Sequence, residues 1–224
     1  MAEWWQRRRL TTLWWSLAVG LASALKWHFS AAEAAEIGWM LQPLALLLRL
    51  VAGWHFQRTP DGEWASADAG LVLVKACAGI NFMTLSFLGW CWLARPRAAV
   101  ARDTAARVAA ARVTVGTTLL EWPALLGGAL VLAWMTALAV NLVRIVAIVR
   151  AQHLLEAWLP PEQAHRLIGI AVFLPALGLQ WLLCEPQRPT RALLAAAGTY
   201  ALLLLGLPLV HAAWDAAFNA ASYR

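Results

Sequence analysis

The sequence predicts an all-α integral membrane protein with about five to six transmembrane helices and a re-entrant or surface-lying segment on the outer face. Two observations support this fold class. Of the 224 residues, 62% are hydrophobic and only 13% are charged, a balance that excludes an ordinary soluble globule. Apolar runs long enough to cross a bilayer also recur along the chain, with only short polar segments between them. We therefore expect a single membrane domain.

The positive charges predict how the chain is oriented. The formal net charge of +6 comes mostly from arginine, and basic residues gather in the cytoplasmic loops of membrane proteins. The excess therefore does not indicate nucleic acid as a partner. Arginines at positions 7–9 precede the first apolar run and hold the N-terminus in the cytoplasm. Residues 94–113 carry five arginines against the single Asp103, which makes this segment the strongest cytoplasmic anchor.

The first two apolar runs have different predicted roles. Leu10 to about Lys26 is either a retained first span or part of a cleaved signal peptide, and its length and tryptophans favour retention. A full crossing by residues 37–54 would place the arginine-rich segment outside the cell. We therefore expect 37–54 to be a re-entrant or surface helix on the outer face, where Pro43 and Arg49 are tolerable.

The middle of the chain begins with a polar outer loop at residues 55–70, with turn chemistry at Pro60–Gly62. A short extended run, Leu71–Val74, follows it. An apolar helix from Cys77 to about Leu93 then runs inward. The next span begins near Val115 and stays apolar through Val149, which is longer than one bilayer thickness.

The last part of the chain begins with an amphipathic stretch at 150–163, which ends at two prolines. His165 opens another apolar helix to about Leu183, a cytoplasmic turn covers 184–191, and a last span covers 192–213. The predicted divisions are an N-terminal span (1–30), an outer-face segment and loop (31–70), a membrane core with the candidate site (71–192), and a C-terminal span and tail (193–224).

Cys77 lies at the predicted start of an apolar helix, beside Lys75 and Gly79. A helix start presents unpaired N–H groups and the positive end of the helix dipole, and both favour thiolate over thiol. Lys75 would act in the same direction. Taken alone, however, a small buried apolar cysteine is the commoner explanation.

The other two cysteines, Cys91 and Cys184, fall towards the cytoplasmic side, where we expect structural roles. The three cysteines show neither a metal-binding spacing nor a disulfide framework. We therefore predict no metal and no cofactor.

The predicted topology places Cys77, Arg144 and His165 at one depth near the outer surface, each at an end of a different helix. An imidazole can deprotonate a thiol, the thiolate can attack a carbonyl, and a guanidinium can stabilise the oxyanion. Simpler explanations stay open, because His165 can cap a helix and Arg144 can extend to the lipid headgroups. His153 and His211 also lie near the outer face and are rival bases.

Three motifs occur in order: Cys-Ala-Gly-Ile-Asn-Phe at 77–82, Asn-Leu-Val-Arg-Ile at 141–145, and His165 with Gly169. Together they resemble the exosortase/archaeosortase family over roughly residues 39–184. The residues around the cysteine are most similar to the exosortase K branch.

The resemblance implies a role for each motif residue. Cys77 would be the nucleophile, Arg144 the cation on the oxyanion side, and His165 the acid and base. Ala78 departs from the family, since many exosortases have serine there, so a hydroxyl at that position is not essential here. The residues with expected supporting roles are Asn141, Gly79 and Asn81.

The family implies a membrane-embedded cysteine protease-transpeptidase of the plasma (inner) membrane, with its active site facing the periplasm or cell exterior. Its partners would be exported proteins that end in a short motif, an apolar helix and a basic tail. The protein would cleave them at the motif and pass them to another surface acceptor. Membrane lipid would surround the helices.

Two other classes of function are open. In a non-catalytic permease or assembly scaffold, Arg144, Asn141 and His165 would line a polar pathway and Cys77 would be incidental. A haem-binding anchor would need axial histidines, and the histidines show no paired pattern on facing spans. Replacing Cys77 with serine separates an enzyme from a pathway, because only the enzyme needs the thiolate.

Overall fold

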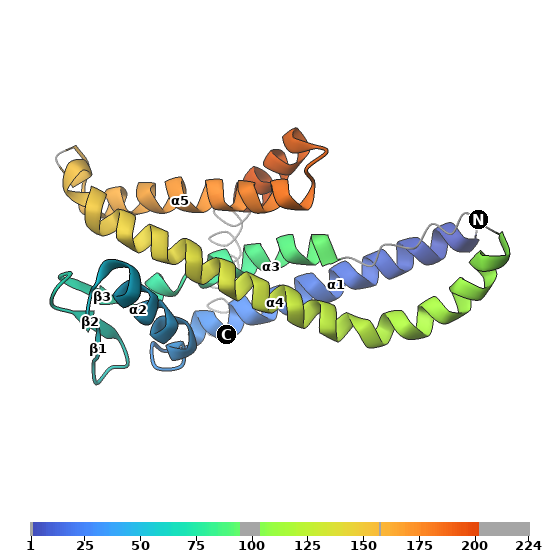
Figure 1. The fold of residues 1–224 in the computed structure, drawn as a ribbon, viewed down its shortest axis with the longest axis horizontal. Helices are drawn as coiled ribbons and strands as arrows, with labels where there is room; N and C mark the ends of the chain where they lie inside the picture. The colour runs from blue at the N-terminus through green and yellow to red at the C-terminus, as the bar shows by residue number, and fades with distance from the viewer. Residues whose placement is uncertain (1, 95–103, 157, 202–224) are drawn as a thin grey trace, which may run out of the picture.

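The computed structural model describes residues 2–94, 104–156 and 158–201, with side chains from residue 8 onwards except 104–120, 152, 153, 155 and 156. Figure 1 shows long helices that share one general direction, with a small sheet and a short helix gathered at one end. The elements in order are α1 (Ala2–Ala31), α2 (Gly38–Ala52), β1 (Gln57–Arg58), β2 (Trp64–Ser66), β3 (Leu71–Leu73), the 3₁₀ turn η1 (Lys75–Ala78), α3 (Ile80–Ala94), α4 (Thr104–Glu156) and α5 (Pro161–Cys184).

Within the part of the chain that the structure describes, three segments are helical, long and apolar enough to cross a membrane, namely Lys75–Ala94, Glu121–Ala151 and Pro161–Cys184. They coincide with three of the predicted spans, so the fold class is confirmed at the level of a mostly helical chain with such helices. α1 is continuous over the first predicted span but is not among the three. Residues 189–201 are helical, and the rest of the predicted last span lies outside the described residues.

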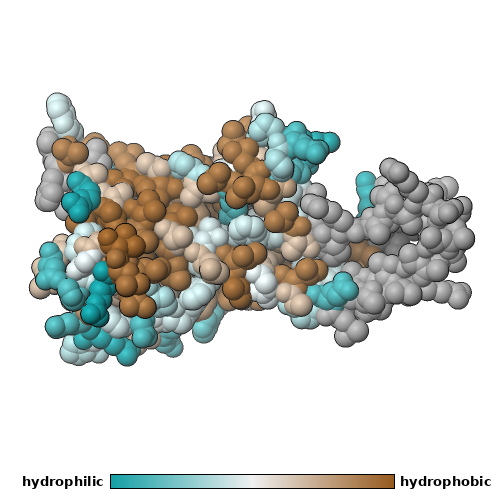
Figure 2. Space-filling model, in the orientation of Figure 1, coloured by the Kyte–Doolittle hydropathy of each residue, from teal (hydrophilic) through white to brown (hydrophobic). Residues whose placement is uncertain are grey.

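The polar and apolar surfaces are unevenly distributed. Polar residues gather over the small sheet, and hydrophobic residues cover much of the neighbouring face of α4 and α5 (Figure 2). Large exposed apolar side chains include Val131, Met135 and Val143 on α4, and Leu167 and Leu179 on α5. Apolar faces of this kind suit a lipid environment.

α2 is a helix of 15 residues, about 22 Å long at 1.5 Å per residue, which is shorter than the hydrocarbon core of a bilayer. This length agrees with the expectation that residues 37–54 do not cross as a helix. α2 packs against α4, η1 and β2, while Arg49 is exposed. Its buried face consists of Met40, Leu41, Leu44, Ala45 and Leu48.

A three-stranded antiparallel sheet, in the order β1-β2-β3, occupies much of the predicted outer loop. The all-α prediction was wrong here, because strands of two or three residues carry too little alternation to stand out from a polar loop. The predicted turn at Pro60–Gly62 is present, and Gly62 has a φ of 82°. A Cβ at Gly62 would lie 2.9 Å from Ala35. β3 confirms the extended run that leads to Cys77.

α4 begins at Thr104 and runs for 53 residues to Glu156, about 80 Å at 1.5 Å per residue. The prediction of a loop through residue 113 was wrong, because the segment is rich in alanine, which favours helix between the arginines. The predicted extension beyond one bilayer thickness is confirmed. Of the predicted amphipathic stretch 150–163, residues 150–156 are instead the end of α4, and α5 begins at Pro161 rather than at His165.

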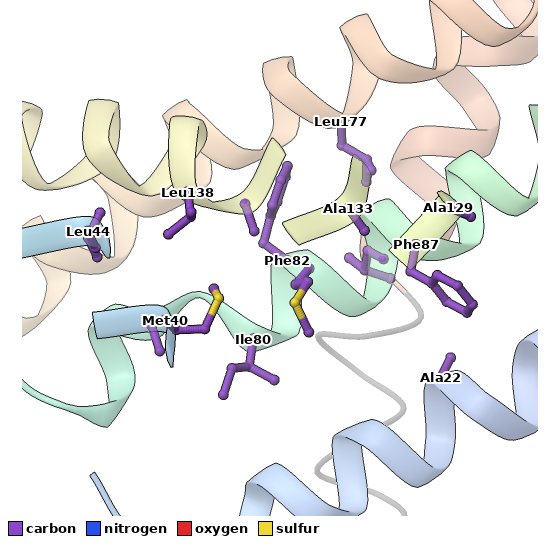
Figure 3. Close-up of a cluster of buried hydrophobic side chains, with 14 of the residues drawn as sticks. Ala22, Met40, Leu44, Ile80, Phe82, Phe87, Ala129, Ala133, Leu138 and Leu177 are labelled. Atoms are coloured by element: carbon purple, nitrogen blue, oxygen red, sulfur yellow. The ribbon is translucent and has the colours of Figure 1, made fainter. Parts of the chain in front are cut away.

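α3 lies at the centre of the core, in contact with α1, α4 and α5. Figure 3 shows side chains from different helices meeting around it, among them Ala22 of α1, Ala133 of α4 and Leu177 of α5. The buried residues from α1 to the helix after α5 form one hydrophobic cluster. The structure therefore has one core, and the sheet end is attached to it through α2 and η1.

The orientation in the membrane can be tested with introduced cysteines, because the buried native Cys184 would stay unlabelled from either side. Asp61 in the sheet turn and Arg188 in the turn after α5 are both exposed. In a Cys77→Ala background, Asp61→Cys should react with a membrane-impermeant maleimide on intact cells. Arg188→Cys should react only after permeabilisation. Reaction of Arg188→Cys on intact cells would overturn the predicted orientation.

Candidate functional site

Cys77 lies in η1, a single turn between β3 and α3. The Val74 carbonyl accepts a hydrogen bond from the Cys77 N–H at 2.8 Å, and Gly79 follows with a φ of 68°. The Gly79 carbonyl then accepts the Met83 N–H at 2.9 Å, so α3 begins after the thiol. The expectation that Cys77 starts the helix was therefore wrong by a turn, and the first N–H groups of α3, at 80–82, have no acceptor within the helix.

Asn141 joins α4 to this turn. Its Nδ2 donates a hydrogen bond to the Ala78 carbonyl at 2.9 Å, and its side chain is 0% exposed. A Cβ at Gly79 would lie 2.6 Å from the Cγ of Asn141 and would overlap its amide nitrogen. Glycine therefore meets two requirements at position 79. It adopts the positive φ without strain, and its lack of a side chain leaves room for Asn141. The first two sequence motifs meet at this contact.

A stripe of small residues brings α4 close enough for that contact. Ala129, Ala133, Ala137 and Asn141 recur every fourth residue, so they share one helix face, and all four are buried. Alanine side chains let two helix backbones approach closely, and α3 packs more extensively against α4 than against any other element. The last position of the stripe is polar, and it faces the backbone ahead of α3.

Arg144 follows Asn141 by one turn and reaches the same region. Its guanidinium carbon lies 5.1 Å from the ring centroid of Phe173 on α5, and Phe173 stacks on Phe82 of α3 at 5.0 Å. A Cβ at Gly169 would lie 3.4 Å from the Nε of Arg144. This Nε is buried and has no hydrogen-bond partner among the described residues. The guanidinium of Arg144 is therefore positioned over the ring of Phe173, and its Nε–H donor stays available for a hydrogen bond.

His165 lies one turn before Gly169 on α5. Its Nδ1 is 2.9 Å from the Pro161 carbonyl, which can only accept, so this contact requires a proton on Nδ1; in a neutral ring Nε2 is then the unprotonated nitrogen. Within the described ranges, no hydrogen bond joins His165 to Cys77 or to Arg144. α5 therefore brings Gly169 to Arg144, whereas a proton transfer between Cys77 and His165 requires further approach.

Cys77 is half-buried, and burial opposes ionisation of its thiol. Of the charged side chains nearby, the cation of Arg144 favours the thiolate and the carboxylate of Glu63 in the sheet turn opposes it. Lys75 does not act as the sequence predicted. Its Nζ donates to the carbonyls of Ser30 at 2.7 Å and Ala32 at 2.6 Å, at the end of α1. Lys75 thus joins η1 to the end of α1 through two hydrogen bonds.

A cavity of about 470 Å³ opens between α1, η1, α3, α4 and α5. Ala76, Gly79, Asn81 and Arg144 contribute to its wall. Cys77 itself is not a lining residue, although Ala76 directly before it and Gly79 two residues after it are. The structure thus brings Arg144 and the expected supporting residues Gly79 and Asn81 to one cavity beside the thiol, with Asn141 behind them.

The remaining candidates lie apart from this cavity or cannot be placed. Cys91 and Cys184 are buried near the other end of α3 and α5, where the Cys184 thiol is 3.7 Å from the Gly89 carbonyl. The side chain of His153 and the whole of His211 lie outside the described residues, so both stay open as rival bases.

Sequence reasoning missed two contributors to the site. Phe173 continues the four-residue spacing of His165 and Gly169 along α5, and that spacing could have placed it on the face towards Arg144. Lys26 of α1 also lines the cavity. No local pattern signals its role, because it is brought there only by the packing of α1.

Comparison of the chain with family models, with curated proteins and with solved structures found no match. The fold and the site define a mostly helical protein, whose described residues include three helices long and apolar enough to cross a membrane. Towards the end that carries the small sheet, it holds a cavity next to a cysteine and an arginine.

The fit between Gly169 and Arg144 predicts a graded response to substitution. Gly169→Ala should be tolerated, because its Cβ meets Nε at an ordinary contact distance of 3.4 Å and alanine favours helix. Gly169→Val should cost about 1–3 kcal/mol of unfolding free energy, because the added methyl groups overpack the site. Thermal unfolding of the purified protein in detergent measures both.

The matched control is Gly20 in α1, where an added Cβ would meet nothing within 4 Å. Gly20→Ala and Gly20→Val carry the same changes of helix propensity without the contact. Equal losses for valine at positions 20 and 169 would show that Arg144 is not packed against Gly169.

Proposed function

We propose that this protein is a membrane-embedded cysteine protease-transpeptidase of the exosortase type, which cleaves exported proteins at a C-terminal sorting signal. The observation that carries the proposal is the contact between two motifs that are far apart in sequence. Asn141 bonds the Ala78 carbonyl across Gly79, and the same helix then directs Arg144 to the cavity beside Cys77. Two motifs that only lay at the same membrane depth would not require such a contact between Asn141 and the Gly79 turn.

The proposed chemistry begins when the Cys77 thiolate attacks the carbonyl carbon of the scissile peptide bond. Arg144 is the natural partner for the oxyanion, because its Nε–H has no other acceptor among the described residues. The first N–H groups of α3 would add donors of the same kind. Both sets of donors are fixed by helices before the substrate arrives, so they need little rearrangement during the reaction.

His165 is the proposed acid and base. Its Nδ1–H is held by the Pro161 carbonyl, which leaves Nε2 to take the thiol proton and to give it to the leaving amine. Breakdown of the tetrahedral intermediate leaves a thioester on Cys77. An acceptor amine or water then attacks the thioester and restores the thiol. Substrate binding would have to bring the ring of His165 within hydrogen-bond distance of Cys77.

The proposed substrates are exported proteins with a C-terminal motif, an apolar helix and a basic tail. The protein offers apolar faces on α4 and α5 next to the site, and a substrate helix lying along them would be confined to two dimensions. Such confinement supplies orientation that a small site cannot supply alone. The positive-inside rule would keep the basic tail in the cytoplasm, with the site at the outer face of the plasma (inner) membrane.

One observation favours a second function, that of a permease or scaffold with a polar pathway. The cavity beside Cys77 is lined by Lys26, Lys75 and Arg144, a concentration of charge that also suits a transported anion. A pathway of this kind needs the cations and does not need the thiol. Substitution of Cys77 therefore separates the two functions.

Cys77→Ser and Cys77→Ala should both abolish processing of exported proteins that carry a C-terminal apolar helix, because serine lacks an accessible anionic form here. Mass spectrometry of the secreted and membrane fractions would measure the loss of the C-terminal segment. Cys184→Ala is the matched control, since it removes a thiol that is buried away from the cavity. Normal processing by Cys77→Ser would contradict the enzyme and favour the pathway.

The same assay assigns the base. His165→Ala should reduce processing as severely as Cys77→Ala, because residues that act as one unit fail together. His153→Ala should have a mild effect. The reverse pattern, with His153 essential and His165 dispensable, would leave Cys77 as the nucleophile but would refute the role given to His165.

A further inference from the structure

The cavity beside Cys77 collects positive charge from three different elements. Lys26 comes from α1, Lys75 from η1 and Arg144 from α4. Among the described residues, no carboxylate forms a salt bridge with any of these three side chains. Partial burial and, to a smaller extent, the like charge of Lys75 both disfavour the charged form of Lys26 when no anion is bound. Cations that share a partly buried cavity without a counter-ion are costly, and a bound anion would remove that cost.

The three side chains keep hydrogen-bond donors available. The ammonium of Lys75 uses two of its three donors on the Ser30 and Ala32 carbonyls. Lys26 is partly buried, and no hydrogen bond of its ammonium to a described residue is present. The Nε of Arg144 is buried without an acceptor. These donors approach from separate helices, an arrangement that suits a group with several oxygens on one centre.

The cavity is also larger and more apolar than a bare ion requires. Its volume of about 470 Å³ far exceeds the ~10–15 Å³ that a cavity needs to hold one water molecule. Four large apolar side chains, Phe29, Ile80, Phe82 and Phe173, also line the wall, together with smaller residues and Asn81. A ligand that fills this space would therefore carry an organic group together with its anionic group.

We propose that this cavity is a binding site for a phosphate group, held by Lys26, Lys75 and Arg144 and borne by a phosphate ester with an apolar part. The chemistry is the same whether the group belongs to a lipid headgroup or is free in solution. Binding does not depend on catalysis by Cys77, so the site can be tested whether or not the protein is an enzyme. A phosphate bound there would occupy the oxyanion side of the thiol.

The test uses the full-length protein purified in an uncharged detergent. Isothermal titration with inorganic phosphate is one arm. The other arm compares a short-chain phosphatidylglycerol with the matching diacylglycerol, which lacks the phosphate. Saturable binding of the phospholipid but not of the diacylglycerol or of inorganic phosphate would identify a lipid headgroup site. Saturable binding of inorganic phosphate, with no gain from the lipid, would show a site for free phosphate and would overturn the assignment of an apolar part to the ligand.

Lys26→Gln should weaken whichever binding is seen by about tenfold or more, the loss of one charge-assisted hydrogen bond. Lys26→Arg keeps the charge and should keep binding within a few-fold, which separates loss of the site from loss of the fold. Arg58→Gln, which removes an exposed cation outside the cavity at the same end, should leave binding unchanged. Absence of binding in both arms, or equal binding by the native protein and Lys26→Gln, would overturn the proposal.

Discussion

The site depends on one hydrogen bond, from the Asn141 amide to the Ala78 carbonyl, made across the bare backbone of Gly79. The bond forms because alanines at every fourth position bring α4 against α3. A buried carbonyl left without a partner would cost about 1–3 kcal/mol, so the contact fixes the turn that carries Cys77. Arg144 is then placed beside the same turn, since it follows Asn141 by one turn of a rigid helix.

This arrangement leaves the positive charges of Arg144 and Lys75 without a neutralising anion among the described residues. Arg144 is held by the ring of Phe173, and Lys75 is held by carbonyls of α1. Neither contact neutralises its cation. A site built in this way can attract an oxyanion during a reaction, as the proposed protease requires, and it can also retain a stable anion such as a phosphate ester. Both uses need Arg144. The protease also needs Cys77, whereas the phosphate site also needs Lys26.

The sequence predicted the features that depend on periodicity and local chemistry. The three apolar segments, the extended run before Cys77 and the turn at Pro60–Gly62 are of this kind. It did not predict the short sheet, the early start of α4 or the bonding of Lys75 to α1, because these depend on pairing and packing between distant segments. The approach of His165 to Cys77 was expected from shared depth alone, and depth does not fix distance across a bundle.

The most direct test of the central contact is a double-mutant cycle on Gly79 and Asn141, read as the unfolding free energy in detergent. Gly79→Ala should be strongly destabilising in the native protein. In the Asn141→Ala background it should cost only about 1–2 kcal/mol, the penalty of a positive φ, because the clashing amide is gone. We predict that the two losses are non-additive by more than ~2 kcal/mol. Losses that add within about 0.5 kcal/mol would contradict the contact between α4 and the Cys77 turn.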